Sequence, residues 1–155
     1  MKKGVIRPLV ICLFSNNDSI LVAEGYDSVS KEYYYRPIGG GIEYGELSSD
    51  ALIREIQEEI KARITNLEYL GTLENIFTYN GEIGHEVVMV YDATFVDTSL
   101  YKTSSFNGEE DDGTIFKLFW KPVSDFQNGK LRLVPENLLE LILEREIKTT
   151  ADSFK

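Results

Sequence analysis

Three glutamates, Glu55, Glu58 and Glu59, have the spacing that gathers carboxylates on one side of a helix. At about 100° per residue, the three side chains share an arc of roughly 100°. Like charges so placed destabilise a helix by roughly 0.2–0.5 kcal/mol per pair, so we expect a partner to offset their repulsion. A hard divalent cation such as Mg²⁺, which binds carboxylates, water and substrate phosphates, would be such a partner.

A run of three glycines, residues 39–41, lies ahead of these glutamates. Glycine lets the backbone bend and come close to a ligand, so the carbonyl groups of this run could approach a metal ion. Together the two features indicate a Mg²⁺ site beside a place for phosphate. The alternative is that the glutamates form a solvated helix face and that the glycine run is only a loop.

The glutamates belong to a predicted helix, residues 48–61, in which Leu52, Ile56 and Ile60 recur at every fourth position. Ser48 or Ser49 is expected to cap its start. The face expected to pack on the core, separate from the acidic stripe, is formed by Ile53, Ile56 and Ile60.

The remaining elements are mostly strands. We expect them over residues 9–14, 20–23, 33–35, 67–79, 86–96 and 114–120. A polar loop is expected over residues 102–113, and a leucine-rich helix over residues 136–147, with Pro135 in its first turn. The pattern indicates an α/β (α+β) fold, with a single domain over residues 1–148 and a polar tail over 149–155.

The 155 residues include 26 acidic against 16 basic side chains, a net charge of −10. This balance disfavours nucleic-acid backbones and anionic membranes as partners, because both are bound through Lys and Arg. The single cysteine, Cys12, cannot form an internal disulfide. No apolar run reaches the roughly 18 residues of a membrane-spanning helix, so we expect a cytoplasmic protein without membrane attachment.

The segment from Gly40 to Glu59 resembles the Nudix box, the sequence signature of the Nudix (MutT-like) hydrolase family. The matching positions, all at the required spacing, are Gly40, Glu46, Arg54, Glu55, Ile56, Glu58 and Glu59. The order of the predicted elements is also similar to that of a whole Nudix domain, an α/β/α sandwich with a mixed sheet. One departure is Lys61-Ala62 in place of the closing glycine and aliphatic residue. In a left-handed helix end, a lysine there would cost roughly 1–2 kcal/mol.

The resemblance implies a Mg²⁺-dependent pyrophosphohydrolase, with Mn²⁺ as the substitute cation. Its substrate would be a nucleoside diphosphate linked to another group, which leaves nucleoside triphosphates, ADP-ribose-like nucleotides and dinucleotides open. Metal ligands would be Glu55, Glu58 and Glu59, with the Gly39 or Gly40 carbonyl as an additional ligand. Arg54 would orient the glutamates, and Glu46 would pair with it.

The general base is left open by the resemblance. Glu58 or Glu59 could serve, as could Glu110 from the acidic run 109–112, which is otherwise a solvated loop. The expected partner is a small nucleotide and not a nucleic acid or a membrane, and the leucines of residues 136–147 could form a homodimer contact. A non-catalytic nucleotide-sensing module on the same fold is the alternative function.

Overall fold

An unbroken apolar run, residues 9–14, needs cover on both faces of any strand that it forms. The computed structural model describes residues 4–153, and side chains as far as residue 146. In it, most of the run belongs to β1 (Ile6–Cys12), which pairs in parallel with β7 (Glu82–Phe95) and antiparallel with β5 (Gly39–Gly41). With β6 (Ile64–Tyr79), these strands make the expected mixed sheet, in the order β5-β1-β7-β6.

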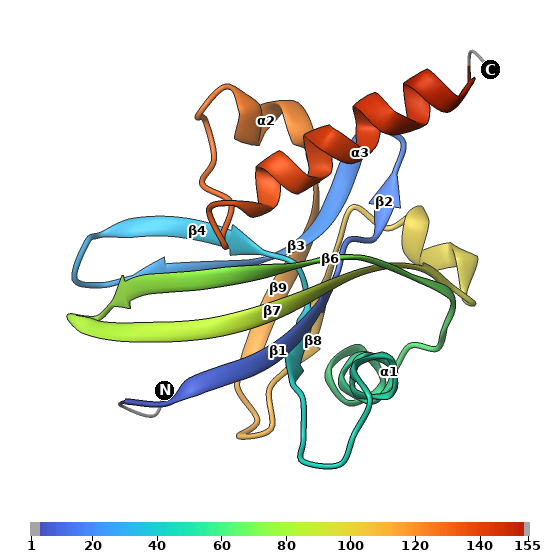
Figure 1. Cartoon of the computed structure of the whole chain (residues 1–155). Coiled ribbons are helices and arrows are strands. Elements are labelled where there is room, and N and C mark those ends of the chain that lie inside the picture. The colour runs from blue at the N-terminus through green and yellow to red at the C-terminus, as the bar shows by residue number, and fades with distance from the viewer. Residues whose placement is uncertain (1–3, 154–155) are drawn as a thin grey trace.

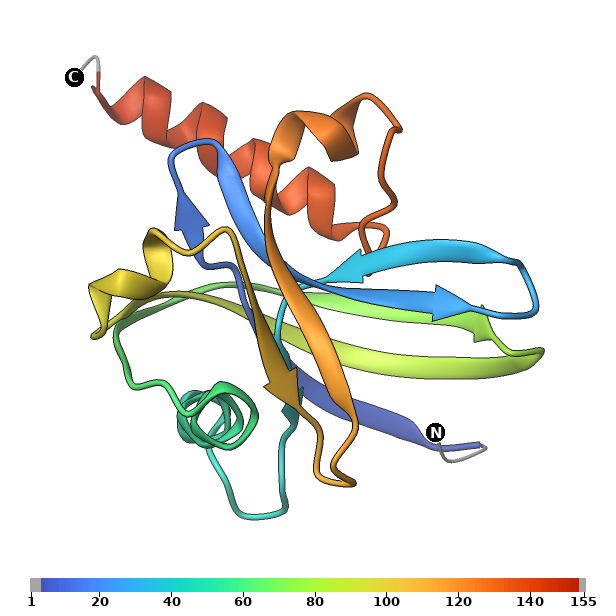
Figure 2. The ribbon, with the colours of Figure 1, turned by 180° about the vertical axis from the view of Figure 1, so that it is seen from behind.

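A second sheet is entirely antiparallel. It has the order β2-β3-β9-β8, with β4 on the other side of part of β3. Its strands are β2 (Ser15–Asn16), β3 (Ser19–Asp27), β4 (Glu32–Arg36), β8 (Ser105–Glu109) and β9 (Ile115–Pro122). The long β3–β4 and β6–β7 hairpins extend side by side away from the helices, as Figures 1 and 2 show.

Helices cover both sides of the sheets. Helix α1 (Ser48–Ile60) lies on one side, and α2 (Val123–Gln127) and α3 (Leu138–Ser153) lie on the other (Figures 1 and 2). A short 3₁₀ helix, η1 (Thr98–Tyr101), follows β7. This is the predicted α/β/α arrangement. Among the described residues, no helix is long and apolar enough to span a membrane.

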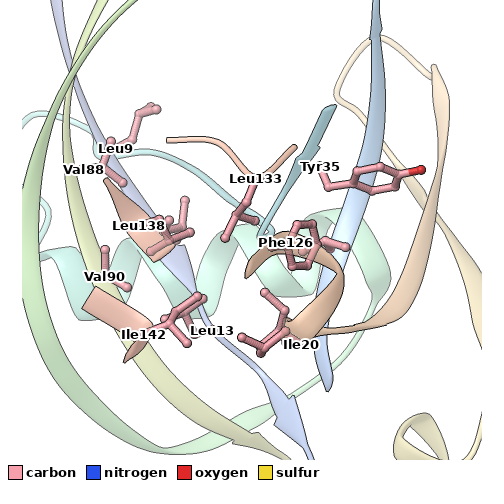
Figure 3. Close-up of a cluster of buried hydrophobic side chains, with 13 residues drawn as sticks. Leu9, Leu13, Ile20, Tyr35, Val88, Val90, Phe126, Leu133, Leu138 and Ile142 are labelled. Atoms are coloured by element: carbon pink, nitrogen blue, oxygen red, sulfur yellow. The ribbon is translucent and has the colours of Figure 1, made fainter. Parts of the chain in front are cut away.

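Strand β1 separates two hydrophobic clusters, because its alternate side chains point to opposite faces. Leu9, Ile11 and Leu13 pack in a cluster with Leu138 and Ile142 of α3, part of which Figure 3 shows. The intervening residues pack with the buried face of α1, and this second cluster includes Val10, Cys12, Phe14, Leu52 and Ile56. The strand therefore anchors α1, the helix that carries the glutamates.

The start of α1 differs from the prediction. Its N-cap is Leu47, and no side chain caps it, because the hydroxyl of Ser48 instead lies 2.7 Å from that of Tyr91. The predicted packing face was also partly wrong, since Ile53 is 44% exposed. The buried residues are Ala51, Leu52 and Ile56, so the buried face is turned toward Glu55 and Glu59.

Three other segments differ from expectation. The glycine run is not a loop but strand β5. The predicted polar loop begins directly after η1 and contains strand β8. Helix α2 was not predicted. Helix α3 begins at Leu138, three residues after Pro135, and continues to Ser153 through most of the segment expected to be a polar tail.

Candidate active site

Strand β5 lies between β1 and the glutamates of α1, and two of its glycines are required by close contacts. A Cβ atom at Gly39 would collide with the backbone of Val10, and one at Gly40 would collide with the carboxylate of Glu55. Glycine at both positions therefore lets the backbone of β5 lie directly beside a glutamate of α1. This juxtaposition supplies carbonyl and carboxylate oxygens at one place.

Arg54 connects the segments around this place. Its guanidinium donates to Glu46 at 2.8 and 2.9 Å, to Glu55 at 2.9 Å and to the carbonyl of Gly41 at 2.9 Å. The hydrogen bonds from Arg54 lower the pKa of Glu46 to about 2, so this carboxylate stays ionised. The pairing expected between Arg54 and Glu46 is present, and it also reaches β5 and Glu55.

The glutamates of α1 do not all face the same space. Glu55 and Glu59 line a cleft of about 380 Å³ together with the glycine run, and Glu110 and Asp111 also line it. Glu58 is not among the lining residues. Its side chain is 44% exposed and lies 3.4 Å from Arg54, at the edge of the cluster. The structure thus brings together Gly39, Gly40, Glu55, Glu59 and Glu110, with Arg54 and Glu46 behind them.

Acidic groups in the cleft are held in a poorly solvated, negatively charged environment. Burial, with repulsion from Glu110 and Glu55, raises the pKa of Glu59 to about 8, although Arg36 acts in the opposite direction. Burial is also the main cause that raises the pKa values of Glu55 and Glu110. A bound cation would reverse these shifts, because it stabilises the ionised carboxylates.

The chemistry of these donors fits a hard divalent cation, which binds several oxygens. Among residues 4–146, whose side chains the structure describes, no group of three or more Asp, Glu, His or Cys side chains already has the arrangement of a metal site. The two carboxylates of α1 that line the cleft, Glu55 and Glu59, and the carbonyls of the glycine run are the candidate protein ligands. Glu58 is near enough to Arg54 to belong to the same charged cluster.

A second cavity of about 830 Å³ adjoins the cleft. Arg7, Tyr34 and Arg36 line both spaces. The sequence alone did not identify either arginine as a candidate site residue. The one feature of the sequence that could have indicated Arg36 was its position four residues before Gly40.

Known proteins match this chain over most of its length. The family model for the NUDIX domain matches residues 5–142. A curated relative, the NAD-capped RNA hydrolase NudC of Pseudomonas aeruginosa, is 26% identical over 140 residues, which are 90% of this chain and 45% of that protein. The chain therefore spans less than half the length of that relative.

Two solved structures share the fold. A NUDIX hydrolase from Nitrosomonas europaea superposes with a TM-score of 0.63 and 15% identity, covering 93% of this chain and 90% of the other. A structure described as an ADP compounds hydrolase has a TM-score of 0.55 and 20% identity, covering 94% of this chain and 74% of the other. At these identities the likeness concerns the fold alone.

Proposed function

The chain belongs to the Nudix family of hydrolases, and from that premise we propose that it cleaves a diphosphate linkage in a small nucleotide with the help of a divalent cation. The observation that carries this proposal is that the Glu55 carboxylate occupies the space a Cβ atom of Gly40 would fill, in a cleft that Glu59 also lines. Carbonyl and carboxylate oxygens together are the ligand set that Mg²⁺ takes, and Mn²⁺ accepts the same donors.

Glu55 and Glu59, the Gly39 or Gly40 carbonyl, and Glu58 from the edge of the cluster would hold the cation. When bound, the cation neutralises phosphate charge and lowers the pKa of a water molecule that attacks phosphorus. Arg54 would keep Glu55 in place through their 2.9 Å hydrogen bond, and Glu46 would fix Arg54. Positioning and charge neutralisation supply most of the catalysis of phosphoryl transfer, so this network would matter as much as any single base.

The base that accepts the proton of the attacking water would be one of three glutamates, Glu58, Glu59 or Glu110. Glu110 also lines the cleft, and its backbone is fixed by a turn in which its N–H donates to the Thr114 carbonyl at 2.8 Å.

The substrate would be a free nucleotide of the ADP-ribose, dinucleotide or nucleoside triphosphate type. The name of the Pseudomonas relative refers to NAD-capped RNA, but this chain spans 45% of that protein. A net charge of −10 disfavours contact with the phosphate backbone of an RNA body. We therefore propose a small nucleotide, acted on in the cytoplasm, and a homodimer through the α3 region stays a prediction.

The test is a screen of these nucleotide classes for Mg²⁺-dependent product release. Glu59→Gln should lower kcat by at least about 100-fold, because it removes a ligand charge from the cleft. Glu144→Gln on the exposed side of α3 is the matched control and should keep full activity. Binding without turnover on every class would instead identify a nucleotide-sensing module, and activity unchanged in Glu59→Gln would exclude the proposed cation site.

A further inference from the structure

The larger cavity has no role in the cleavage step, although it opens directly onto the cleft where that step would occur. Its volume of about 830 Å³ lies in the upper part of the roughly 300–1,000 Å³ range that is usual for ligand sites. The cavity lies between the β3–β4 hairpin, the β6–β7 hairpin and residues 132–137, which lead into α3. It has room for a nucleoside rather than for a phosphate group alone.

Two arginines, Arg7 and Arg36, lie at the junction of the two cavities. Arg36 is half-buried there, and none of the ion pairs among the described residues includes it. Arg7 is 3.9 Å from the carboxylate of Glu86 and is 43% exposed. Arg54, Arg132 and Arg145 each contact a carboxylate more closely, at 2.8, 3.0 and 2.7 Å. Of these three arginines, Arg132 also lines the larger cavity. Arg7 and Arg36 therefore keep donors for an anion, and guanidinium groups bind phosphate at two points.

Aromatic rings form a wall of the larger cavity. On β6 the side chains of Asn75, Phe77 and Tyr79 are half-buried, whereas those of the residues between them are exposed. The alternating side chains of the strand thus turn Phe77 and Tyr79 to the inside. The ring of Tyr34 meets that of Tyr79 edge to face, with 6.1 Å between centroids. Such rings offer surfaces on which a base can stack, at about 1–3 kcal/mol per base.

Two of the polar groups that line the cavity are buried acceptors, the Glu86 carboxylate and the Oδ1 atom of Asn137. Glu86 is 4% exposed, and its carboxylate accepts a hydrogen bond from Asn75 at 3.3 Å. Asn137 donates to the Glu74 carbonyl at 3.3 Å, but its buried Oδ1 has no partner within the described part of the chain. An unsatisfied buried acceptor costs about 1–3 kcal/mol, which an N–H donor on a ligand would recover.

We propose that the larger cavity binds the nucleoside of the substrate, and that Arg7 and Arg36 hold its phosphates where they cross into the acidic cleft. The base stacks on the wall of Tyr34, Phe77 and Tyr79. The acceptors favour a base that carries an amino group, such as adenine or cytosine, over one that carries a carbonyl at the same position. This inference rests on the proposed function, because it names the nucleoside part of the same substrate.

The test maps binding rather than turnover. Backbone amide shifts in NMR spectra of the full chain would be followed as adenosine, pyrophosphate, ADP or IDP is added. Adenosine should shift amides of Tyr34, Phe77 and Tyr79, and pyrophosphate should shift those of Arg36 and Gly40. ADP should shift both groups and should bind several times more tightly than IDP, which has a carbonyl in place of the amino group.

Variants separate the two parts of the subsite. Arg36→Gln should weaken ADP binding by about tenfold or more and leave adenosine binding unchanged, because only ADP has phosphates. Phe77→Ala should weaken the binding of both ADP and adenosine and leave pyrophosphate binding unchanged. Asn137→Leu should abolish the preference for ADP over IDP. Arg63→Gln, an exposed arginine outside both cavities, is the control for lost charge. The same spectra report whether each variant is folded. If Arg36→Gln does not fold, Arg36→Lys is measured in its place.

Two results would overturn the inference. One is adenosine shifts that lie outside the larger cavity, and the other is ADP affinity that is the same in Arg36→Gln and in the unmodified chain. Neither depends on hydrolysis. Mapped shifts without any turnover would disprove the proposed function and keep the subsite, whereas turnover with shifts elsewhere would disprove the subsite and keep the function.

Discussion

Arg54 binds the carboxylate of Glu46 at two points, with its Nε 2.8 Å from Oε2 and its Nη2 2.9 Å from Oε1. The same guanidinium donates to Glu55 and to the carbonyl of Gly41. One side chain therefore ties the segment before α1, the strand β5 and a candidate metal ligand into a fixed arrangement. A planar guanidinium with five donors can do this, and an ammonium group cannot.

Arg54→Lys should accordingly reduce activity while the charge is kept. Lysine has no rigid fork, so Glu55 and β5 would lose their common donor, and we expect kcat to fall by about 10–100-fold. Steady-state kinetics on the best substrate of the screen would measure this. Arg145→Lys is the control, because Arg145 contacts Asp92 at 2.7 Å outside both cavities. An equal loss in the two variants would mean that Arg54 acts only through general stability.

Gly40→Ala should impair the same site by a different route. The added methyl group would meet the Glu55 carboxylate, so either Glu55 or β5 must move. We expect at least a tenfold loss of Mg²⁺ affinity, by analogy with groups that orient metal ligands. Titration of Mg²⁺ against activity measures it. At Gly41 an added Cβ would meet nothing within 4 Å, so Gly41→Ala should lose much less Mg²⁺ affinity than Gly40→Ala. Equal losses would show that steric contact with Glu55 is irrelevant.

Helix α1 and its acidic positions could be foreseen because they depend on local spacing. The period of the apolar residues gave the helix to within one residue of its end, and the spacing of the acids located Arg54, Glu55 and Glu59. The N-cap could not be foreseen, because the hydroxyl of Ser48 has a distant partner in Tyr91. A contact across 43 positions leaves no local trace in the sequence.

Strand β5 and the larger cavity depend on contacts between distant segments. Glycine is disfavoured in strands, so a run of three predicts a loop. The run becomes a strand because β1 offers its edge, with Val10 opposite Gly40. Arg7 and Arg36 belong to different sheets and meet only in the folded chain. The spacing of residues in the sequence therefore could not predict that these two arginines lie together.

Stability without metal should fall as the pH rises. The pKa of Glu59 is about 8 in the folded chain, against a reference value of 4.5. Below pH 4.5 the group is protonated in both states, so its contribution to stability is complete there. Between the two values only the unfolded chain loses the proton, and stability falls by up to about 1.4 kcal/mol per pH unit until the folded pKa is passed.

Thermal unfolding of the chelated protein measures this effect. Its Tm should fall between about pH 5 and pH 8, and Glu59→Gln, which cannot ionise, should make that fall shallower. Mg²⁺ should raise the Tm more at the alkaline end of this range, because the cation stabilises the ionised form. A Mg²⁺ effect on Tm that is the same at both ends would contradict the assignment of Glu59 to the cation site.

Lys61 ends α1 in the left-handed conformation, with φ of 54° and ψ of 35°, where the Nudix box has glycine. The chain thus keeps the usual backbone route and places a side chain on it, which costs roughly 1 kcal/mol. The Lys61 ammonium donates to the Glu58 carbonyl at 2.8 Å and satisfies one of the free carbonyls at the helix end, which offsets part of that cost.

Lys61→Gly should therefore stabilise the protein slightly, since relief of the strained conformation outweighs the loss of an exposed hydrogen bond. The increase in Tm should be at most about 2–4 °C for a domain of this size. Lys61→Ala is the matched control, because it removes the ammonium group and keeps the Cβ atom in the strained position. It should unfold below both the unmodified chain and Lys61→Gly in the same calorimetric scan. If the glycine variant melts no higher than the alanine variant, the left-handed conformation of residue 61 costs nothing measurable.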